Sequence, residues 1–323
     1  MELKPLDGRK FPRFSGISTF FRLPHHPVVE DLDVAVLGVP WDGSVSFRPG
    51  ARFGPRATRE ASVLMRAYSP EADIRPFDTL AVADAGDVSV VPHDAAATAA
   101  NIEEHVSRAI AGGGRTVCVG GDHSIALPIL RAMARKHGPV GLVHFDAHSD
   151  TYPAAWGNEY HHGTPFRKAV EEGILDPART VQIGLRGGLA GADDYTFAKQ
   201  HGFRLVFLDE LMEKGTGSVA GAIREIATGK VYLSMDVDAI DPAYAPGTGT
   251  PVPGGLTSRE ALHLIRSCRG LDIVGADVVE LSPPYDVQQI TALLAAQMAW
   301  EAVVLMAAFK KDAGAAAAAA STK

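Results

Sequence analysis

Apolar positions along the chain fall into short runs that alternate with longer segments of helical periodicity. The runs at 33–40, 116–120 and 140–145 are each followed by a segment in which apolar residues recur every three or four positions. The same alternation continues through strand-like runs at 180–185, 204–209, 230–238 and 271–281, and it ends in a helical segment from about 289 to 310. Strands and helices in alternation are typical of a parallel sheet with helices on both faces.

Two of the expected strands, "VGLVHF" (140–145) and "VYLSM" (231–235), are apolar at nearly every position. Strands that are covered by helices on both sides have this composition, because neither of their faces meets water. With a weaker strand near 80–86 included, we expect an α/β fold with a parallel sheet of about eight strands.

The spacing of these elements leaves no segment long enough to act as a linker, so we expect one domain over residues 1–323. Residues 1–30 precede the first strand and contain "FSGISTFFRLP", which we expect to form an ordered arm or a subunit contact. Residues 311–323, "KDAGAAAAAASTK", are of low complexity, and we expect them to form a frayed tail.

Charge and composition narrow the class of function. A formal net charge of -7 and a pI near 5.9 argue against binding to nucleic acid or to an anionic membrane, since both attract clustered Lys and Arg. With 46% hydrophobic and 21% charged residues, the chain can bury the core of a globular protein. A small partner, neutral or cationic, fits this charge better.

The two cysteines, Cys118 and Cys268, lie in apolar or helical segments without the spacing of metal ligands. They predict neither a disulfide framework nor a zinc finger, and they favour a reducing compartment. We find no apolar run that approaches the roughly 18 residues of a membrane span, and the start "MELKPLDGRKFPRF" lacks the apolar core of a signal peptide. We therefore expect a cytoplasmic protein with no membrane partner.

Acidic residues and histidines gather directly after three of the expected strands, in "GGDHS", "FDAHSD" and "SMDVDAIDP". In the first motif Asp122 and His123 open a helix. In an extended segment, residues at i, i+2 and i+4 point to one face, and open parallel sheets bind ligands beyond the carboxyl ends of their strands. The candidate metal ligands are therefore His123, Asp146, His148, Asp150, Asp236 and Asp238.

Four carboxylates a few ångströms apart in a partly dry site cannot all stay ionised unless a cation lies between them. A single Asp after a strand is usually a helix cap or a turn residue, but six donors at three strand ends are hard to explain in that way. Six ligands without a thiolate suit two ions that share carboxylates. Oxygen-rich ligation favours Mn²⁺, with Co²⁺, Ni²⁺ or Fe²⁺ as alternatives, over a structural Zn²⁺.

These motifs resemble the signature blocks of the ureohydrolase (arginase and agmatinase) family. The similarity includes "GGDHS", "FDAHSD" and "SMDVDAIDPAYAPGTGTPVPGGLTSRE", extends to "RPGARFGPRATRE", "HHGTPF" and "DVVELSPPYD", and covers about residues 14–308. The resemblance implies a three-layer α/β/α arginase-like fold and two Mn²⁺ per subunit at the six ligands named above. It also implies hydrolysis of a guanidino compound to urea and an amine by a metal-bridging hydroxide.

The resemblance assigns catalytic roles to three residues. Asp150, besides being a ligand, would accept a proton as the tetrahedral intermediate forms. His162 in "HHGTPF" would pass a proton to the leaving amine, and Glu280 in "DVVELSPPYD" would accept two N–H bonds from the planar substrate cation. Without the family match, Glu280 paired with an arginine such as Arg259, or with a helix terminus, is the alternative. His161 matches no family role, and we expect it to line the mouth of the site.

Substrate choice depends on the loop "TYPAAWGNEYHH" (151–162), which holds Trp156 and Asn158. The loop lacks the pattern of Asn and Ser residues with which arginase-type members grasp an amino acid, and it offers no Arg or Lys near Trp156 for an acidic substrate. "GGDHSIALPIL" resembles the agmatinase branch. We therefore expect agmatine to be cleaved to urea and putrescine, with substrate contacts from Trp156, Asn158, His161 and Glu280. Guanidinobutyrase, guanidinopropionase, proclavaminate amidinohydrolase and other alkylguanidine hydrolases are the alternatives.

Two further hypotheses come from other classes of protein. A non-catalytic scaffold subunit would be expected to lose a metal ligand, and none of the six is missing. A deacetylase on the same fold would use one zinc ion, which does not explain six ligands. Family members commonly form trimers or hexamers, so the resemblance also implies a homo-oligomer. The remaining histidines lie outside any ligand spacing, on expected loops or helix faces, and we expect them to be structural; they include His25, His26, His93, His105, His144, His201 and His263.

Overall fold

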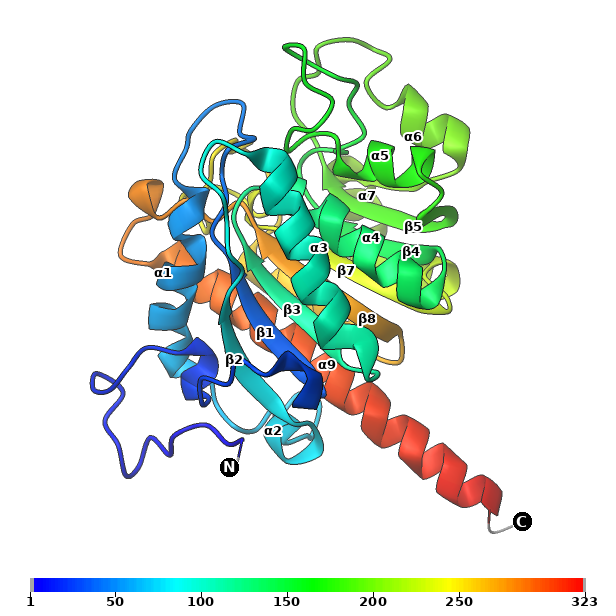
Figure 1. Ribbon diagram of the computed structural model, residues 1–323. Helices are drawn as coiled ribbons and strands as arrows, with labels where there is room; N and C mark the ends of the chain where they lie inside the picture. The colour runs from blue at the N-terminus through cyan, green and yellow to red at the C-terminus, as the bar shows by residue number, and fades with distance from the viewer. Residues whose placement is uncertain (1–2, 322–323) are drawn as a thin grey trace.

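The computed structural model describes residues 3–321 and is built around one parallel sheet (Figure 1). The strand order across the sheet is β2-β1-β3-β8-β7-β4-β5-β6, and every neighbouring pair is parallel. The strands are β1 (Val34–Val39), β2 (Val82–Asp87), β3 (Arg115–Gly120), β4 (Val140–Phe145), β5 (Leu175–Leu185), β6 (Arg204–Phe207), β7 (Lys230–Asp236) and β8 (Asp272–Val279). The predicted parallel sheet of about eight strands is confirmed.

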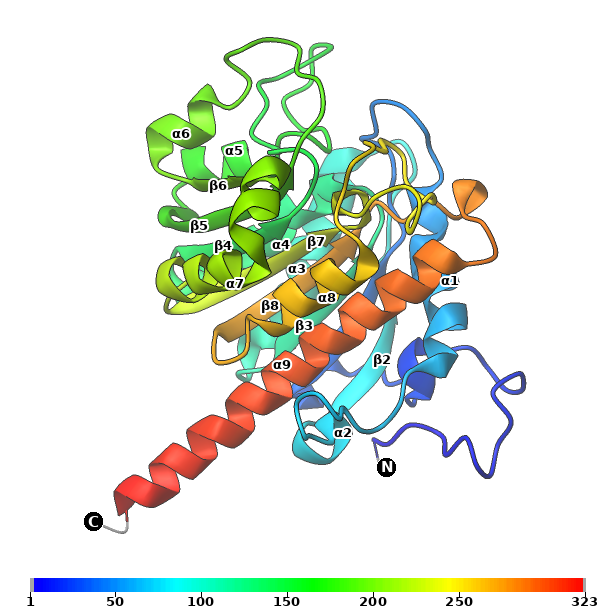
Figure 2. The same cartoon turned by 180° about the vertical axis from the view of Figure 1, so that it is seen from behind.

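Helices cover both faces of this sheet, so the fold has three layers (Figures 1 and 2). Helices α3 to α6 contribute to the core on one face, and α1, α2 and α7 to α9 contribute to the core on the other. The helices are α1 (Gly54–Ala61), α2 (Pro76–Thr79), α3 (Ala95–Ala111), α4 (Ala126–His137), α5 (Pro165–Glu171), α6 (Thr196–His201), α7 (Leu208–Ile226), α8 (Ser258–Arg266) and α9 (Ile290–Ser321).

The composition of β4 follows from this double coverage. Val143 and Phe145 point into the core beneath α7 to α9, whereas Val140 and Leu142 point into the core beneath α3 to α6. Successive side chains of a strand point to opposite faces, so a strand covered on both sides needs apolar residues at odd and even positions alike. The same rule places His144 on the face of Val140 and Leu142, inside the protein.

The N-terminal segment before β1 is partly anchored to the domain. Phe20 and Phe21, in a short 3₁₀ turn (Phe20–Arg22), are buried in the core that includes α1 and α9. Phe14 and Ile17, in contrast, are 94% and 89% exposed. The segment therefore presents apolar side chains to solvent immediately beside its anchor.

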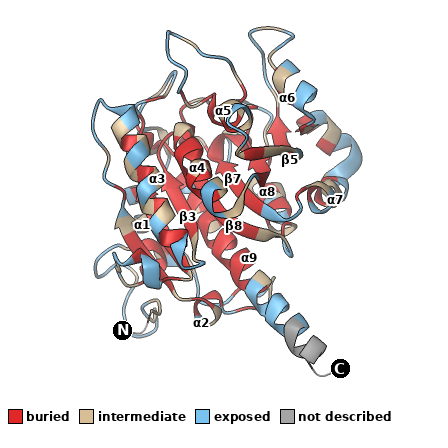
Figure 3. Ribbon diagram, turned by 45° about the vertical axis from the view of Figure 1, so that its right-hand side comes forward, coloured by how far each residue is buried: buried red, intermediate tan, exposed pale blue. Residues whose placement is uncertain are grey.

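Helix α9 differs from the sequence-based expectation in two respects. It continues to Ser321 instead of ending near residue 310, so the low-complexity tail is helical up to that residue; alanine has the highest helix propensity. Its part Ile290–Ala316 is also long and apolar enough to span a membrane, although we expected no such run. However, 83% of its most apolar window is buried inside the protein, and Figure 3 shows the buried part of the helix followed by an exposed stretch. Burial of this helix in the core explains its composition.

Candidate metal centre

Four neighbouring strands bring the predicted ligands to one edge of the sheet. In the strand order β3-β8-β7-β4, the carboxyl ends lead into His123, Glu280, Asp236 and Asp146 respectively. β8 and β7 come last in the sequence but lie between β3 and β4 in space, so they carry their side chains into the gap between the other two motifs. The structure thus brings together the three motifs that the sequence singled out.

Backbone geometry fixes the direction of the first motif. Gly121 has a φ of 51°, and a Cβ at this position would lie 2.5 Å from the carbonyl oxygen of Trp41, so the turn requires glycine. Asp122 accepts a hydrogen bond from the backbone N–H of Ser124 at 3.0 Å and caps the helical turn that begins at His123. The prediction that Asp122 and His123 open a helix is confirmed.

The first group of candidate ligands surrounds His123, which is completely buried. Its Nδ1 lies 2.9 Å from Asp150 Oδ2 and 3.3 Å from Asp146 Oδ2. A third carboxylate oxygen, Asp236 Oδ2, lies 3.4 Å from the same nitrogen. One imidazole nitrogen and three carboxylate oxygens therefore converge on a single point.

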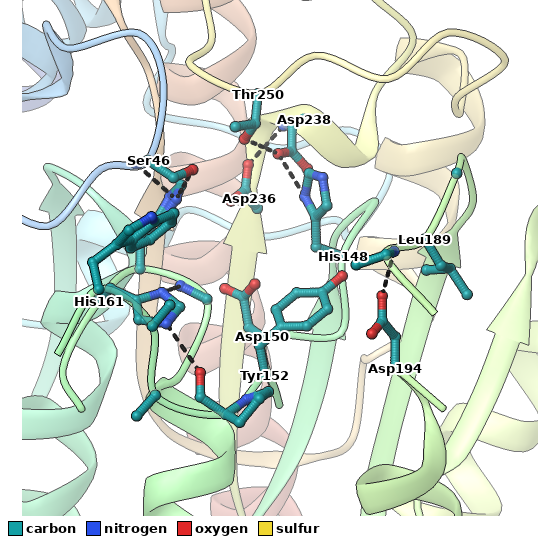
Figure 4. A pocket seen from close by; sticks show the side chains of 18 residues that line it. Ser46, His148, Asp150, Tyr152, His161, Leu189, Asp194, Asp236, Asp238 and Thr250 are labelled. Carbon is teal, nitrogen blue, oxygen red and sulfur yellow. Dashed lines mark hydrogen bonds and ion pairs between the residues drawn. The ribbon is translucent and has the colours of Figure 1, made fainter. Parts of the chain in front are cut away.

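The second group lies on the other side of Asp146. His148 Nδ1 is 3.1 Å from Asp238 Oδ2 and 3.2 Å from Asp146 Oδ1. The two oxygens of Asp146 thus face different histidines, as a carboxylate shared by two ions would. In Figure 4, a dashed line joins His148 to Asp238, and Asp150 and Asp236 point into the same space.

The hydrogen bonds of His123 show why a cation fits here. Ser234 Oγ donates to Asp277 Oδ1 at 2.8 Å, so at 2.8 Å from His123 Nε2 it acts as the acceptor of the ring N–H. His123 Nδ1 then faces three carboxylate oxygens, and despite burial these carboxylates raise the pKa of the ring well above its ordinary value. Converging carboxylates repel one another in a buried site unless positive charge lies among them.

The acidities of the carboxyl groups show the same need for positive charge. Burial raises the pKa of Asp236 well above its ordinary value, and the charges of Asp238 and Asp146 raise it further. Burial and the charge of Asp146 likewise raise the pKa of Asp238. The pKa of Asp146 is well below its usual range despite burial, because imidazoles surround it. Oxygen and nitrogen donors without a thiolate suit two hard or borderline divalent ions, which would let all these carboxylates ionise.

His144 was wrongly placed on a loop or helix face by the sequence analysis. It lies within β4, fully buried, with Nε2 2.9 Å from Asp146 Oδ2. The signal was present in the sequence, because His144 precedes Asp146 by two positions and so points to the same face of the strand. The other six histidines expected to be structural do not line the pocket described below, within the part of the chain that the structure covers.

Two of the three residues predicted to be catalytic have unusual backbone conformations. Asp150 and Glu280 have φ values of 49° and 63°, in the left-handed region that non-glycine residues rarely adopt. Such a conformation costs about 1–3 kcal/mol and persists only where the surrounding structure imposes it, typically at functional sites. The surrounding fold therefore imposes a backbone conformation that lowers stability but sets the direction of these two carboxylates.

Glu280 is buried and pairs with histidine rather than with arginine. Its Oε1 accepts the backbone N–H of His123 at 2.8 Å and lies 3.0 Å from His162 Nδ1. Arg259, the alternative partner, lines a separate pocket beside α7 and α8. Oε1 is therefore engaged twice, and the acceptance of two substrate N–H bonds by Glu280 stays a prediction. Oε2, which has no partner among the described residues, is the free acceptor.

His162 is held between Glu280 and a loop that the sequence analysis did not single out. Burial alone would lower its pKa, but the charges of Glu280, Asp150 and Asp122 raise it from its ordinary value of 6.5 to about 9. Ser46 contacts the other ring nitrogen: its backbone N–H donates to Nε2 at 3.1 Å, and its Oγ lies 2.7 Å from the same atom. Ser46 lies more than a hundred positions away from His162, and no local pattern marks it.

Beside the ligands lies a pocket of about 430 Å³ (Figure 4). Trp156, 79% exposed, and His161 line it, as expected of residues at the mouth of the site. Leu189 and Asp194, from the segment that links β5 to α6, line it as well and were not predicted. The remaining described lining consists of Ser46, His148, Asp150, Tyr152, Pro153, Ala154, Ala155, His162, Gly163, Gly188, Ala190, Asp236, Asp238 and Thr250, without a Lys or Arg.

Asn158 does not lie where the sequence analysis placed it. Its backbone exchanges hydrogen bonds with Ala155 at 2.9 and 3.0 Å, and its side-chain oxygen accepts the N–H of Tyr160 at 2.9 Å. It lines a neighbouring pocket with Tyr160 and Arg131 instead of the pocket beside the metal ligands. The prediction that Asn158 contacts the substrate is therefore not supported, because its polar groups stabilise a turn.

Comparison with known proteins agrees with the family resemblance of the motifs and covers almost the whole chain. Residues 32–305 match the model of the arginase family. A guanidinopropionase of Pseudomonas aeruginosa is 50% identical over 94% of this chain and 96% of its own. A mitochondrial agmatinase of Gallus gallus is 47% identical over 91% of this chain and 87% of its own.

A solved structure, proclavaminate amidino hydrolase from Streptomyces clavuligerus, superposes with a TM-score of 0.90. It is 46% identical and covers 93% of this chain and 100% of its own. The three-layer arginase-like fold inferred from the sequence is thereby confirmed. The chain belongs to the arginase family and is a guanidino hydrolase.

Proposed function

We propose that the chain is an agmatinase that hydrolyses agmatine to urea and putrescine with two Mn²⁺ ions, Ni²⁺ or Co²⁺ being the alternatives. The observation that carries the proposal is the charge of the pocket. Apart from the candidate metal ligands, its described lining contains one carboxylate, Asp194, and no Lys or Arg. Agmatine carries a cation at each end, and this lining offers a negative group to the end that is not cleaved.

The chemistry of the cleaved end follows from the residues around the ligands. Two divalent ions, held by the six candidate ligands, would supply an activated water near neutral pH. Glu280 Oε2 is free to accept an N–H of the substrate guanidinium and to hold its plane in place. Asp150 would take the proton that is released when water adds to the central carbon.

The leaving amine needs a proton, and His162 is placed to donate it. A pKa of about 9 keeps the imidazole protonated at neutral pH, so it is an acid before the reaction begins. On the pocket side of the ring, Nε2 accepts the backbone N–H of Ser46 at 3.1 Å and lies 2.7 Å from Ser46 Oγ. Transfer of one proton from the His162 imidazolium to the departing nitrogen would release the cleaved end of putrescine as a free amine.

The far end of the substrate would lie between Asp194 and Trp156. Asp194 is half-buried and accepts the backbone N–H of Ala190 at 2.8 Å, which holds its carboxylate on the pocket wall. The indole of Trp156 packs edge to face against His161, with ring centroids 5.6 Å apart. A carboxylate and an aromatic ring together form a suitable environment for an alkylammonium group.

Hydrolysis of a guanidino acid is the second candidate. The 50% identity to a guanidinopropionase favours it. The carboxylate of such a substrate would, however, approach Asp194 without a cationic side chain among the described lining residues. Like charges in a partly desolvated pocket lower affinity, so we favour agmatine.

Urea release from agmatine, 4-guanidinobutyrate, 3-guanidinopropionate and arginine tests the proposal. We expect the highest kcat/KM with agmatine, and Asp194→Asn should raise KM for agmatine about tenfold, corresponding to about 1.4 kcal/mol of lost binding. Asp193→Asn is the matched control, because this neighbouring carboxylate does not line the pocket. Turnover of a guanidino acid without turnover of agmatine would contradict the proposal.

A further inference from the structure

Two buried polar residues have no part in the chemistry above, although they lie directly behind a candidate ligand. His144 in β4 is the cross-strand partner of Gln182 in β5, and both side chains are completely buried. A polar pair inside an apolar core is costly unless its hydrogen bonds are satisfied, so the bonds of this pair reveal what it does.

The hydrogen bonds assign the proton on the His144 ring. Gln182 Nε2 lies 2.6 Å from the carbonyl oxygen of Ser149, which can only accept, so the amide nitrogen must face it. The same nitrogen lies 3.0 Å from His144 Nδ1 and donates its second hydrogen there. His144 Nδ1 is therefore an acceptor, and the neutral ring carries its proton on Nε2. Nε2 lies 2.9 Å from Asp146 Oδ2 and donates to it.

Packing holds the ring in this orientation. The His144 ring lies 4.4 Å from the Phe166 ring and 5.1 Å from the His123 ring, measured between centroids. Phe166 in α5 is completely buried and closes the core above β4. Rotation of His144 would therefore break the bond to Gln182 and displace a packed aromatic ring.

We infer that His144, oriented by Gln182, is a positioning residue that fixes the shared carboxylate of Asp146 between the two candidate metal ions. The N–H of His144 occupies one lone pair of Oδ2 and leaves the other directed toward the His123 side, while Oδ1 faces His148. The inference rests on the proposed function in one respect, namely that two ions bind here. Groups that hold a ligand in this way typically contribute 10–100-fold to metal affinity.

Calorimetric titration of the metal-free protein with Mn²⁺ tests this inference without relying on catalysis. His144→Leu removes the donor and should weaken binding of Mn²⁺ about 10–100-fold. His144→Gln retains an N–H that can reach Asp146, and its affinity should lie closer to wild type than that of His144→Leu. Gln182→Leu frees the ring to change its protonated nitrogen and should weaken binding in the same direction.

Thr180→Val is the matched control, because Thr180 is also completely buried on β5 but bonds to the carbonyl oxygen of Asp176 instead. This variant should bind Mn²⁺ like the wild type. Wild-type affinity in both His144→Leu and Gln182→Leu would overturn the inference while leaving the proposed function intact. Complete loss of one equivalent of metal in His144→Gln would also overturn it, because His144 would then be a ligand. A wild-type protein that binds no Mn²⁺ would instead refute the metal site itself.

Discussion

At the scale of single residues, the centre depends on histidines whose ring protons are assigned by their neighbours. Ser234 accepts from His123, Gln182 donates to His144, and Glu280 faces His162. Each partner lies on a strand end or strand that is remote in sequence from the histidine it contacts. Replacing a partner should therefore change which ring nitrogen carries the proton, although the histidine itself is unchanged.

The pH dependence of His162 follows from this arrangement. Its pKa in the folded protein is raised from 6.5 to about 9 because the charge of Glu280 outweighs burial. The protonated form is thus the donor below pH 9, and it is lost as pH rises through 9. We expect urea formation to decline above pH 9, and His162→Gln should lower kcat by about 10²–10⁴ and remove this decline.

The raised pKa of His162 also stabilises the folded protein. This contribution is fully present below pH 6.5 and is lost as pH rises through 9.

Rate–pH profiles of the wild type and of His162→Gln measure the expected alkaline decline in urea formation. An unchanged alkaline decline in the variant would assign the titrating group elsewhere.

At the scale of elements, the strands and the three ligand motifs could be predicted from the sequence because their signals are local. Apolar runs mark the buried strands, and i, i+2 spacing marks side chains that share a face. The pairing of His144 with Gln182 was not predictable in this way, because it depends on the register between β4 and β5. Ser46 and Asp194 come from irregular loops, where no periodicity indicates the direction of a side chain.

Helix α9 provides a prediction at this scale. Trp300 is 4% exposed, and its Nε1 donates to the carbonyl oxygen of Arg66 at 3.0 Å, so Trp300→Ala should reduce the free energy of unfolding by about 3–5 kcal/mol. Deletion of residues 314–323 should change it by less than about 0.5 kcal/mol, because residues 314–316 are exposed. Denaturant unfolding measures both, and a large loss of stability in the truncated chain would show that the helical tail has a packing partner.

At the scale of the whole molecule, the exposed apolar residues of the N-terminal arm support the proposal of a homo-oligomer. Phe14 and Ile17 are 94% and 89% exposed, and burying them against another subunit would be favourable. We expect trimers or hexamers by mass photometry, and Phe14→Ser combined with Ile17→Ser should shift the population to smaller species. A wild-type particle that stays at the chain mass of 34.1 kDa would refute the proposal.

The measurement that tests the central claim most directly is metal content and urea formation before and after thorough chelation. We expect about two equivalents of divalent metal per chain, loss of urea formation when both are removed, and recovery when Mn²⁺ is added back. This result follows if the six candidate ligands hold two cations. A chelated protein that is free of metal and still forms urea at its original rate would contradict the account.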